Sequence, residues 1–245
     1  MSKQLRSKIL RSFREGVKEF QLITPSDVIL IGLSGGKDSL ALLDMMGDLL
    51  RHSNRAFTLH ALHVRMAGVD YQSDTTYLRQ QCERNGIAFH ERLVSFEADR
   101  NERRTPCFLC SWNRRKALFT LAQEIGCNKI ALGHNQDDFI ETMLMNMTFQ
   151  GAFSAMTPLM RMEKFPITII RPLCLVNEND VEKYAIESAF PPQIKNCPYE
   201  NDSNRKSMKD LLRHLEQLNP EARYNLWGAM SNIQTELLPP KTNKK

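Results

Sequence analysis

The stretch DVILIGLSGGKDSLALLDMM, residues 27–46, constrains the fold more than any other part of the sequence. It begins with a short β-branched apolar run, which is typical of a buried strand. Two glycines follow, and the apolar residues then recur at helical spacing. A strand, a tight turn and a helix in this order form one βα unit, the building block of parallel sheets.

The same alternation continues along the chain, so we predict an α/β fold. The expected fold is an open parallel sheet of about five strands with helices on both faces, flanked by an N-terminal helix and a C-terminal helical extension. The later strands are predicted at 56–64, 87–94, 128–135 and 167–173, and the helices within 70–84 and at 111–125, 136–149 and 177–189, with helical structure again over 205–238.

No repeat or low-complexity linker interrupts the 245 residues, so we predict one domain over 1–245. It would comprise a basic N-terminal helix (1–20), an α/β core (21–190) and a cysteine loop with a helical extension (191–245). The composition, 42% hydrophobic and 25% charged, is that of a globular protein. The sequence has neither a signal-peptide pattern nor an apolar run of membrane-spanning length, so we expect a cytoplasmic protein without a membrane partner.

The glycine turn does not match the two commonest phosphate-binding loops. Ile31 stands where a Walker A loop needs its first glycine, and Asp38 stands where it needs serine or threonine. Ser34 stands where the dinucleotide fingerprint requires its second glycine. The turn therefore belongs to a different class.

The residues that remain, SGGKDS at 34–39, still suit a phosphate or a pyrophosphate. Gly35 and Gly36 allow a tight backbone turn with exposed N–H groups at a helix start. Lys37, Ser34 and Ser39 add further donors, whereas Asp38 beside phosphates suggests a magnesium ion or a catalytic role. The bland alternative, a tight turn that merely uses two glycines, explains neither the lysine nor the two hydroxyls.

A second polar turn, in IALGHNQDDFIETML, follows another predicted strand. It contains Gly133, His134, Asp137 and Asp138. Because ligands of parallel sheets bind at the carboxyl ends of the strands, we expect this turn near the first and its carboxylates near the phosphates. A hydrogen-bonded turn histidine and a helix N-cap for the aspartates are the competing interpretations.

In a reducing compartment, six cysteines do not predict a disulfide framework. Cys107 and Cys110 have metal-ligand spacing before a helix predicted to begin near Ser111, and the helix start with Arg114 and Arg115 favours thiolates. The pair could also be half a zinc site or a redox dithiol. Three others, Cys82, Cys127 and Cys174, have the settings of small core residues.

Several segments together resemble one family. LSGGKDSLALL resembles the PP-loop of the N-type ATP pyrophosphatases, which split ATP between the α and β phosphates. PCFLCSWNRRKALF, ALGHNQDDFIETMLMNM, IIRPL and AFPPQIKNCPYENDSNR follow in the order seen in the tRNA 2-thiocytidine synthetase family. The resemblance covers most of the chain and implies ATP, Mg²⁺ and a [4Fe-4S] cluster as cofactors. The cluster ligands it implies are Cys107, Cys110 and Cys197, with one iron left open.

The resemblance also implies a mechanism and partners. The C2 oxygen of a tRNA cytidine would be adenylated with loss of pyrophosphate, and sulfur delivered by the cluster would replace AMP. Lys37 would stabilise the phosphate charge, and Asp38 with Asp137 or Asp138 would hold magnesium. We expect tRNA phosphates to meet the basic segments 3–18 and 100–116, and a cysteine desulfurase or another donor to supply sulfur. A homodimer is compatible with the sequence.

One position departs from the thiocytidine pattern and leaves alternatives open. Glu200 in CPYE stands where that family usually has a further cysteine. This departure leaves the tRNA position open. A tRNA 2-thiouridine synthetase or another thiolase of the same branch is the second enzymatic hypothesis. A non-catalytic iron–sulfur nucleotide sensor is the third, although such a sensor would have little need for Lys37 and the aspartates.

Overall fold

The computed structural model describes residues 3–54, 56–67, 71–95, 106–163, 165–195 and 204–239. Its contacts group the chain into two compact units. The first, here called the sheet unit, comprises 1–136 and 157–202, and the second, the helical unit, comprises 137–156 and 203–245. The organisation of the whole chain as one PP-loop domain stays a prediction.

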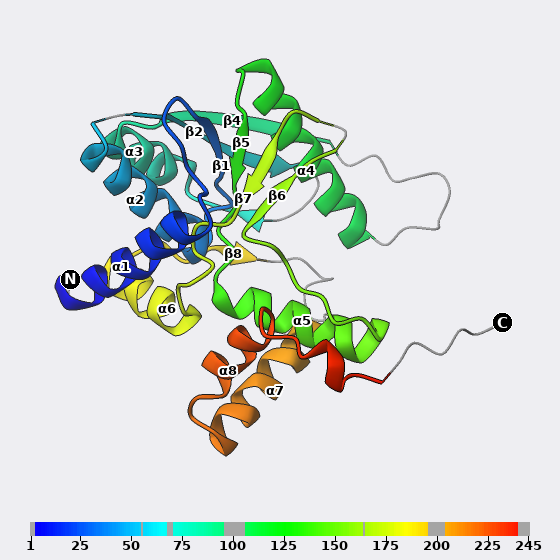
Figure 1. Ribbon diagram of the computed structural model, residues 1–245. Coiled ribbons are helices and arrows are strands. Elements are labelled where there is room, and N and C mark those ends of the chain that lie inside the picture. Colours follow the sequence, from blue (N-terminus) through cyan, green and yellow to red (C-terminus); the bar gives the residue numbers. More distant parts are fainter. Residues whose placement is uncertain are drawn as a thin grey trace. The chain divides into compact units, whose positions relative to one another are not determined.

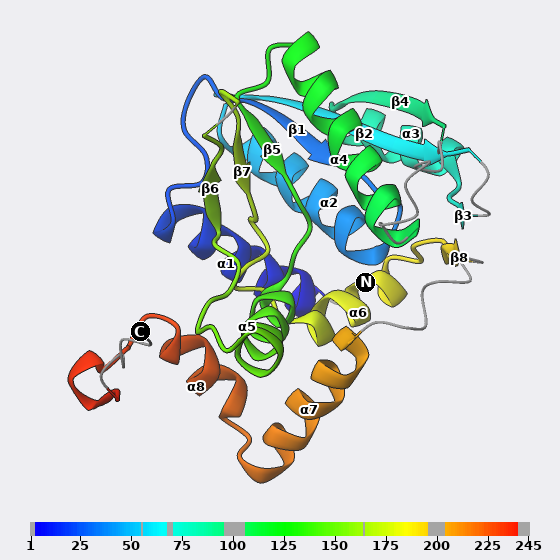
Figure 2. The same cartoon turned by 90° about the vertical axis from the view of Figure 1, so that its right-hand side faces the viewer.

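A six-stranded sheet forms the centre of the sheet unit, with strand order β4-β2-β1-β5-β7-β6 (Figures 1 and 2). Its strands are β1 (Val28–Gly32), β2 (Thr58–Met66), β4 (Ala88–Val94), β5 (Lys129–Ala131), β6 (Leu159–Arg161) and β7 (Thr168–Ile170). Five of them are parallel neighbours, which confirms the five predicted strands. The sixth, β6, is antiparallel to β7 and was not predicted. Because so short a connection cannot make a parallel crossover, β6 and β7 form a hairpin.

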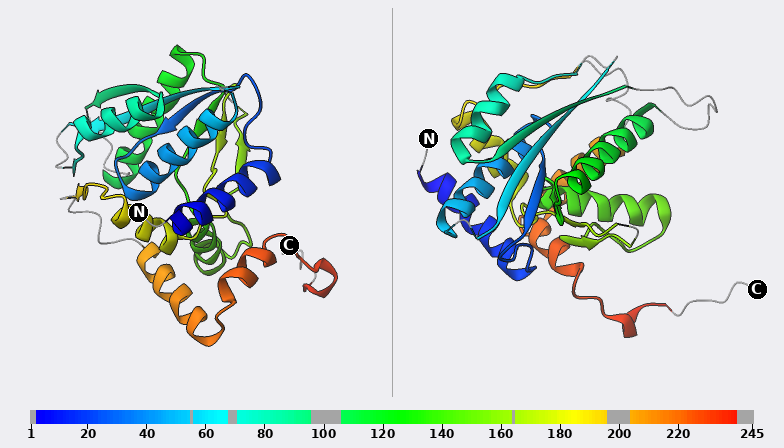
Figure 3. Two further views of the ribbon diagram at one scale, coloured as in Figure 1. Left: turned by 90° about the vertical axis from the view of Figure 1, so that its left-hand side faces the viewer. Right: turned by 90° about the horizontal axis from the view of Figure 1, so that it is seen from above.

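Helices cover both faces of this sheet, as predicted (Figure 3). They are α1 (Lys3–Glu19), α2 (Lys37–His52), α3 (Thr75–Asn85), α4 (Pro106–Glu124) and α6 (Glu178–Glu187). Alternate strand residues point to opposite faces. Ile29 and Ile31 of β1 are buried with α1, α2, α3 and α6, whereas Leu30 is buried with Leu121 and Ala122 of α4.

The sequence correctly predicted the ends of two helices. Gly86 ends α3 in the left-handed conformation with φ of 68°, and its N–H donates to the Cys82 and Glu83 carbonyls. Gly126, with φ of 73°, follows α4 in the same way. Glycine is favoured at such positions because a Cβ atom would be strained there. Asp74 caps the start of α3 by accepting a hydrogen bond from the Tyr77 N–H.

The predicted start of α4 was wrong. The helix begins at Pro106 rather than near Ser111, so Cys107 and Cys110 belong to the helix and do not precede it. Proline is well suited to a first helical position, since it lacks only an N–H that has no partner there. The two cysteines are three positions apart in one helix and therefore lie on the same side of it.

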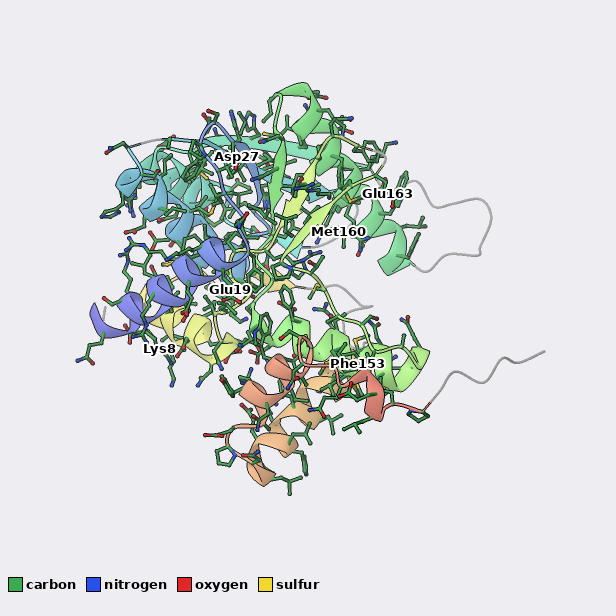
Figure 4. The ribbon with its side chains drawn as sticks, viewed as in Figure 1. Lys8, Glu19, Asp27, Phe153, Met160 and Glu163 are labelled. Carbon is green, nitrogen blue, oxygen red and sulfur yellow. The ribbon has the colours of Figure 1, made fainter. Side chains whose placement is uncertain are left out.

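The N-terminal helix α1 packs against α2 and α6 through paired charges. Arg6 donates to Asp48 at 3.1 Å and Arg14 donates to the other oxygen of Asp48 at 2.8 Å. Lys8, labelled in Figure 4, forms an ion pair with Asp180 of α6 at 2.7 Å. The sequence predicted a basic face for RNA, but three of its cations have carboxylate partners within the sheet unit.

The helical unit contains most of α5 (Gln136–Gln150) with α7 (Asn204–Leu218), α8 (Ala222–Ala229) and a 3₁₀ turn at Thr235–Leu237. Its core is formed by Ile140 and Leu144 of α5 with Met208 and Leu212 of α7. Phe139 meets Trp227 edge to face, with ring centroids 5.5 Å apart. The described part of 205–238 is thus mainly helical, as predicted. No helix in the described ranges is long and apolar enough to cross a membrane.

Candidate functional site

The turn 34–39 connects β1 to α2 at the carboxyl end of the strand. Gly35 has φ of 87°, in the region that favours glycine. A Cβ atom at Gly35 would also lie 2.5 Å from the Ser73 hydroxyl oxygen. Both the backbone conformation and the close approach of Ser73 therefore require glycine at this position.

The two serines of the turn hold its shape. The Gly35 N–H donates to Ser39 Oγ at 3.1 Å, and the Gly36 N–H donates to Ser34 Oγ at 3.3 Å. Ser39 Oγ in turn donates to the Gly36 carbonyl at 2.9 Å. These contacts explain the spacing of the two hydroxyls, which the sequence had suggested only as phosphate donors.

The beginning of α2 is suited to an anion. Gly36 is the N-cap residue, and no side chain caps the helix. The first amides of a helix have no intrahelical acceptor and carry the positive end of its dipole. A phosphate at this place would accept hydrogen bonds from those amides, so the residues present fit a nucleoside triphosphate.

Lys37 lies among carboxylates at the same helix start. Its Nζ is 3.0 Å from Asp38 Oδ2 and 3.1 Å from Glu178 Oε1 of α6. Burial alone would lower the pKa of Lys37, but Asp38 and Glu178 raise it above its ordinary value. The lysine therefore stays a cation at neutral pH. Sequence analysis missed Glu178, whose only signal was its place in an acidic helix start.

The second polar turn reaches the first, as predicted. A Cβ atom on Gly133 would lie 3.0 Å from the carbonyl atoms of Asp38 and 3.1 Å from the Ser39 nitrogen. Glycine thus allows the turn after β5 to pack on the backbone of α2. Asn135 Nδ2 donates to Asp38 Oδ1 at 2.9 Å, while the neighbouring His134 is half-buried. Sequence analysis had not singled out Asn135.

Two further side chains support the phosphate loop from outside. Gln193 Nε2 donates to the Ser34 carbonyl at 2.6 Å and to Ser73 Oγ at 2.9 Å. Gln193 directly precedes β8 (Ile194–Lys195), which pairs with β3 (Tyr71–Gln72). Their pairing keeps the support in place. Gln193 lies in the segment AFPPQIKNCPYENDSNR, but sequence analysis gave neither Gln193 nor Ser73 a role at the loop. Cys197 follows a few positions later in the sequence, outside the described residues.

A buried histidine fixes the strand end before the loop. His63 of β2 places Nδ1 2.7 Å from the Leu33 carbonyl, and 3% of the residue is exposed. Burial lowers the pKa of His63 despite that hydrogen bond and the nearby Glu91. The neutral ring therefore donates through Nδ1 to the residue that precedes Ser34. Sequence analysis did not identify this contact.

Asp137 and Asp138 lie in the helical unit, at the start of α5. Arg223 of α8 forms an ion pair with Asp137 and donates to Glu216 through Nε at 2.8 Å. Arg205 of α7 contacts Asp138 at 2.7 Å. Asp137 and Asp138 thus each have an arginine partner within their own unit. Their roles toward a metal stay predictions.

Three cysteines, Cys82, Cys127 and Cys174, are buried core residues, as predicted. Burial raises the pKa of Cys82 and Cys174 to about 12 and that of Cys127 to about 11, so these thiols stay protonated. Cys110, by contrast, is a half-buried free thiol near the beginning of α4. The described residues include no group of three or more metal-ligating side chains. Because Cys197 lies outside them, the three-cysteine cluster site stays a prediction whose donor type fits iron and sulfide.

The sheet topology and the turn together define a class of protein. A family model described as a PP-loop domain matches residues 3–214, and the chain belongs to this family. Within it, the chain belongs with the proteins named tRNA-cytidine(32) 2-sulfurtransferase. The one from Geobacter sulfurreducens is 37% identical over 239 residues, covering 94% of this chain and 91% of its own. The one from Geobacter metallireducens is 36% identical over 233 residues, covering 93% and 90%.

A solved structure agrees with this placement. The U34-tRNA thiolase NcsA from Methanococcus maripaludis, determined with its [4Fe-4S] cluster, superposes with a TM-score of 0.71 and 25% identity. The match covers 91% of this chain and 79% of that chain. The predicted family and fold class are therefore confirmed.

Proposed function

We propose that this protein is an ATP-dependent tRNA sulfurtransferase that converts a cytidine of tRNA to 2-thiocytidine. One observation carries the proposal: a single chain combines an SGGKDS phosphate loop with a cysteine pair at the beginning of α4. The loop suits ATP, and the cysteine pair suits sulfur chemistry. The names of its relatives specify cytidine 32 of tRNA as the substrate.

The residues of the loop would serve the adenylation step. The C2 oxygen of the cytidine attacks the α phosphorus of ATP, and pyrophosphate leaves. Lys37, kept positive by its pKa, would turn from Asp38 and Glu178 toward the phosphates and offset the charge that builds there. Asp38, oriented by Asn135, supplies a carboxylate of the kind that binds Mg²⁺. Asp137 or Asp138 would contribute only after leaving its arginine partner.

The sulfur step would use Cys107, Cys110 and Cys197. A bound [4Fe-4S] cluster with one open iron would supply the sulfur that displaces AMP. In this chain, Cys107 and Cys110 lie three positions apart at the beginning of α4, a spacing that would let both sulfur atoms hold one cluster. A sulfur donor such as a cysteine desulfurase, a homodimeric state and a cytoplasmic location are further parts of the proposal.

Thiolation of unmodified tRNA in vitro tests the function directly. The anaerobically purified protein is incubated with tRNA, ATP, Mg²⁺ and sulfide, and the digested nucleosides are analysed by mass spectrometry. We expect ATP-dependent 2-thiocytidine. The appearance of 2-thiouridine would favour the alternative related to the U34 thiolase, and the absence of any thiolated nucleoside would favour a nucleotide sensor.

Matched cysteine variants test the cluster assignment separately. Cys110→Ala should lose the visible absorption and most of about four irons per chain. Cys174→Ala should retain both, since Cys174 is a buried core thiol and its loss should affect only packing. The same comparison applies to Cys107→Ala and Cys197→Ala. Stoichiometric zinc in active, colourless protein would overturn the assignment.

A further inference from the structure

Helix α4 presents an exposed aromatic stripe, defined here as Phe108, Trp112 and Lys116. These residues are four positions apart, so they follow one line along the helix. Phe108 is 50% exposed and Trp112 is 46% exposed, whereas Leu121 and Ala122 of the same helix are buried against the sheet. Large aromatic side chains are normally covered, so an exposed pair in line indicates a contact surface.

The stripe is held in place and is positively charged. Lys116 Nζ lies 5.3 Å from the centre of the Trp112 ring, a cation–π contact that orients the indole on the helix surface. Arg115, next to Lys116, is also exposed. From Pro106 to Gln123 the helix contains no acidic residue. The charge of this surface therefore complements a polyanion.

The stripe is distinct from the cysteine side of the helix. Successive helical residues turn by about 100°, so Cys107, Cys110 and Arg114 lie on one side of α4 and the stripe lies largely on the other. A helix with its side chains is about 10–12 Å across. A nucleotide stacked on Trp112 would thus be a neighbour of the reacting nucleotide and not that nucleotide itself.

From these observations we infer that the α4 stripe binds an unpaired segment of the tRNA by stacking a base on Trp112. Lys116 and Arg115 contact the phosphates on either side of that base. Aromatic side chains interleaved with cations are the usual arrangement for single-stranded nucleic acid, because every base offers a π face and every nucleotide a phosphate. The inference rests on the proposed function and adds the type of RNA structure that the protein holds.

The test uses substitutions that separate stacking from charge. Trp112→Leu keeps an apolar side chain but removes the stacking surface, whereas Trp112→Phe retains an aromatic ring. We expect Trp112→Leu to weaken binding of an unmodified tRNA transcript on the order of tenfold, with an unchanged salt dependence. Trp112→Phe should bind nearly as well as the wild type. Lys116→Gln should instead reduce the slope of log affinity against log salt by about one.

Fluorescence reports whether a base meets Trp112. The chain has two tryptophans, and Trp227→Phe removes the other one while preserving an aromatic contact with Phe139. In this background we expect an unmodified tRNA transcript, or its isolated loop as a short hairpin, to quench the Trp112 emission. A fully paired RNA duplex of equal length should quench it much less.

The outcomes distinguish the stripe from the proposed function. If RNA leaves the Trp112 emission unchanged and wild type and Trp112→Leu bind tRNA with equal affinity, the stacking inference is overturned, even if the wild type thiolates tRNA. If RNA quenches the Trp112 emission and Trp112→Leu binds tRNA more weakly, but no thiolated nucleoside forms, the stacking inference is supported and the proposed function is overturned. Quenching by anionic phospholipid vesicles but not by RNA would show a membrane surface and also overturn the inference.

Discussion

Two helices of the sheet unit are rich in cations, and the structure uses them differently. Arg6 and Arg14 of α1 share the buried Asp48, and Lys8 pairs with Asp180. On α4, neither Arg115 nor Lys116 forms an ion pair with another described residue, and the only acid of that helix is Glu124 near its end. In the sequence both segments appear as basic stretches.

The difference teaches that the number of cations on a helix does not indicate its partner. A cation whose carboxylate lies on a neighbouring element contributes to the packing of that element. A cation without such a neighbour is available to an external anion. Substitutions can separate the two kinds of cation. Lys37 is the instructive case, because it has internal partners and is nevertheless proposed to act in the reaction.

Lys37→Ala should have the largest effect on activity. Lys37 is ion-paired with Asp38 and Glu178, yet we expect its loss to lower ATP-dependent thiolation by roughly 10²–10³-fold, because it stabilises charge that develops on the phosphates. Thermal stability should change little. Lys183→Ala, on the exposed side of α6, is the control. Retained activity in Lys37→Ala would show that Lys37, like Arg6 and Arg14 of α1, serves only to pair with neighbouring carboxylates.

Lys129→Met should have the largest effect on stability. Lys129 Nζ lies 2.6 Å from Asp27 Oδ2 and donates to the Leu22 carbonyl at 3.0 Å, in a site where both side chains are nearly inaccessible. Removing one partner leaves a buried, uncompensated carboxylate, so urea unfolding should show a loss of about 3–5 kcal/mol. The double variant Asp27→Asn, Lys129→Met should recover part of this loss. Equal stability of the single variant and the wild type would contradict a structural role.

The Asp27 carboxyl also predicts a pH dependence for that variant. Burial would raise the pKa of Asp27, but hydrogen bonds from Lys129, the Thr24 backbone and Asn128 hold it below its ordinary value. A carboxyl whose pKa is lowered by folding stabilises the protein above its unfolded pKa. That stability is lost as the pH falls through the folded pKa. The difference in the free energy of unfolding between wild type and Lys129→Met should therefore become smaller below about pH 4.

The sequence predicted those parts of the fold and site that depend on local pattern. Short β-branched apolar runs that alternate with helical spacing identified the five parallel strands, and glycines identified the ends of α3 and α4. The approach of Gly133 to Asp38 followed from a general property of parallel sheets. The strand β6 was missed because it is a three-residue edge strand in which Met160 and Arg161 are exposed, so it forms no apolar run.

The partners of the site could not be found in the same way, because they come from distant parts of the chain. Glu178 meets Lys37 across 141 positions, and Gln193 meets Ser34 across 159. Glu178 belongs to no motif. Gln193 lies in a segment that resembles the family, but nothing in the sequence pairs it with Ser34, and only packing brings the two together. The same limit applies to Asp48, which decides the role of the basic residues in α1.

Replacing Arg6 and Arg14 with Gln should affect folding and leave RNA binding unchanged. Both guanidinium groups donate to Asp48, whose side chain is 6% exposed. Burial would raise the pKa of Asp48, but Arg6 and Arg14 keep it below the ordinary value. We expect a loss of about 1–3 kcal/mol in the free energy of unfolding at neutral pH. A flatter salt dependence of tRNA binding in this variant would instead show that α1 contacts RNA phosphates. Arg11→Gln, at an exposed position of the same helix, is the matched control.

Arg205→Ala should have the smallest effect on stability. Arg205 is 45% exposed, so its ion pair with Asp138 is screened by solvent and should contribute less than about 1 kcal/mol. Arg213→Ala removes a similarly exposed pair with Asp210 and provides the reference.

The informative readout is Mg²⁺ binding, measured by calorimetry in the presence of a non-hydrolysable ATP analogue. If Asp138 is a magnesium ligand, the loss of its competing arginine should tighten Mg²⁺ binding in Arg205→Ala and leave it unchanged in Arg213→Ala. Equal Mg²⁺ affinity in both variants would assign Asp138, like Asp48, to the carboxylates that hold helices together.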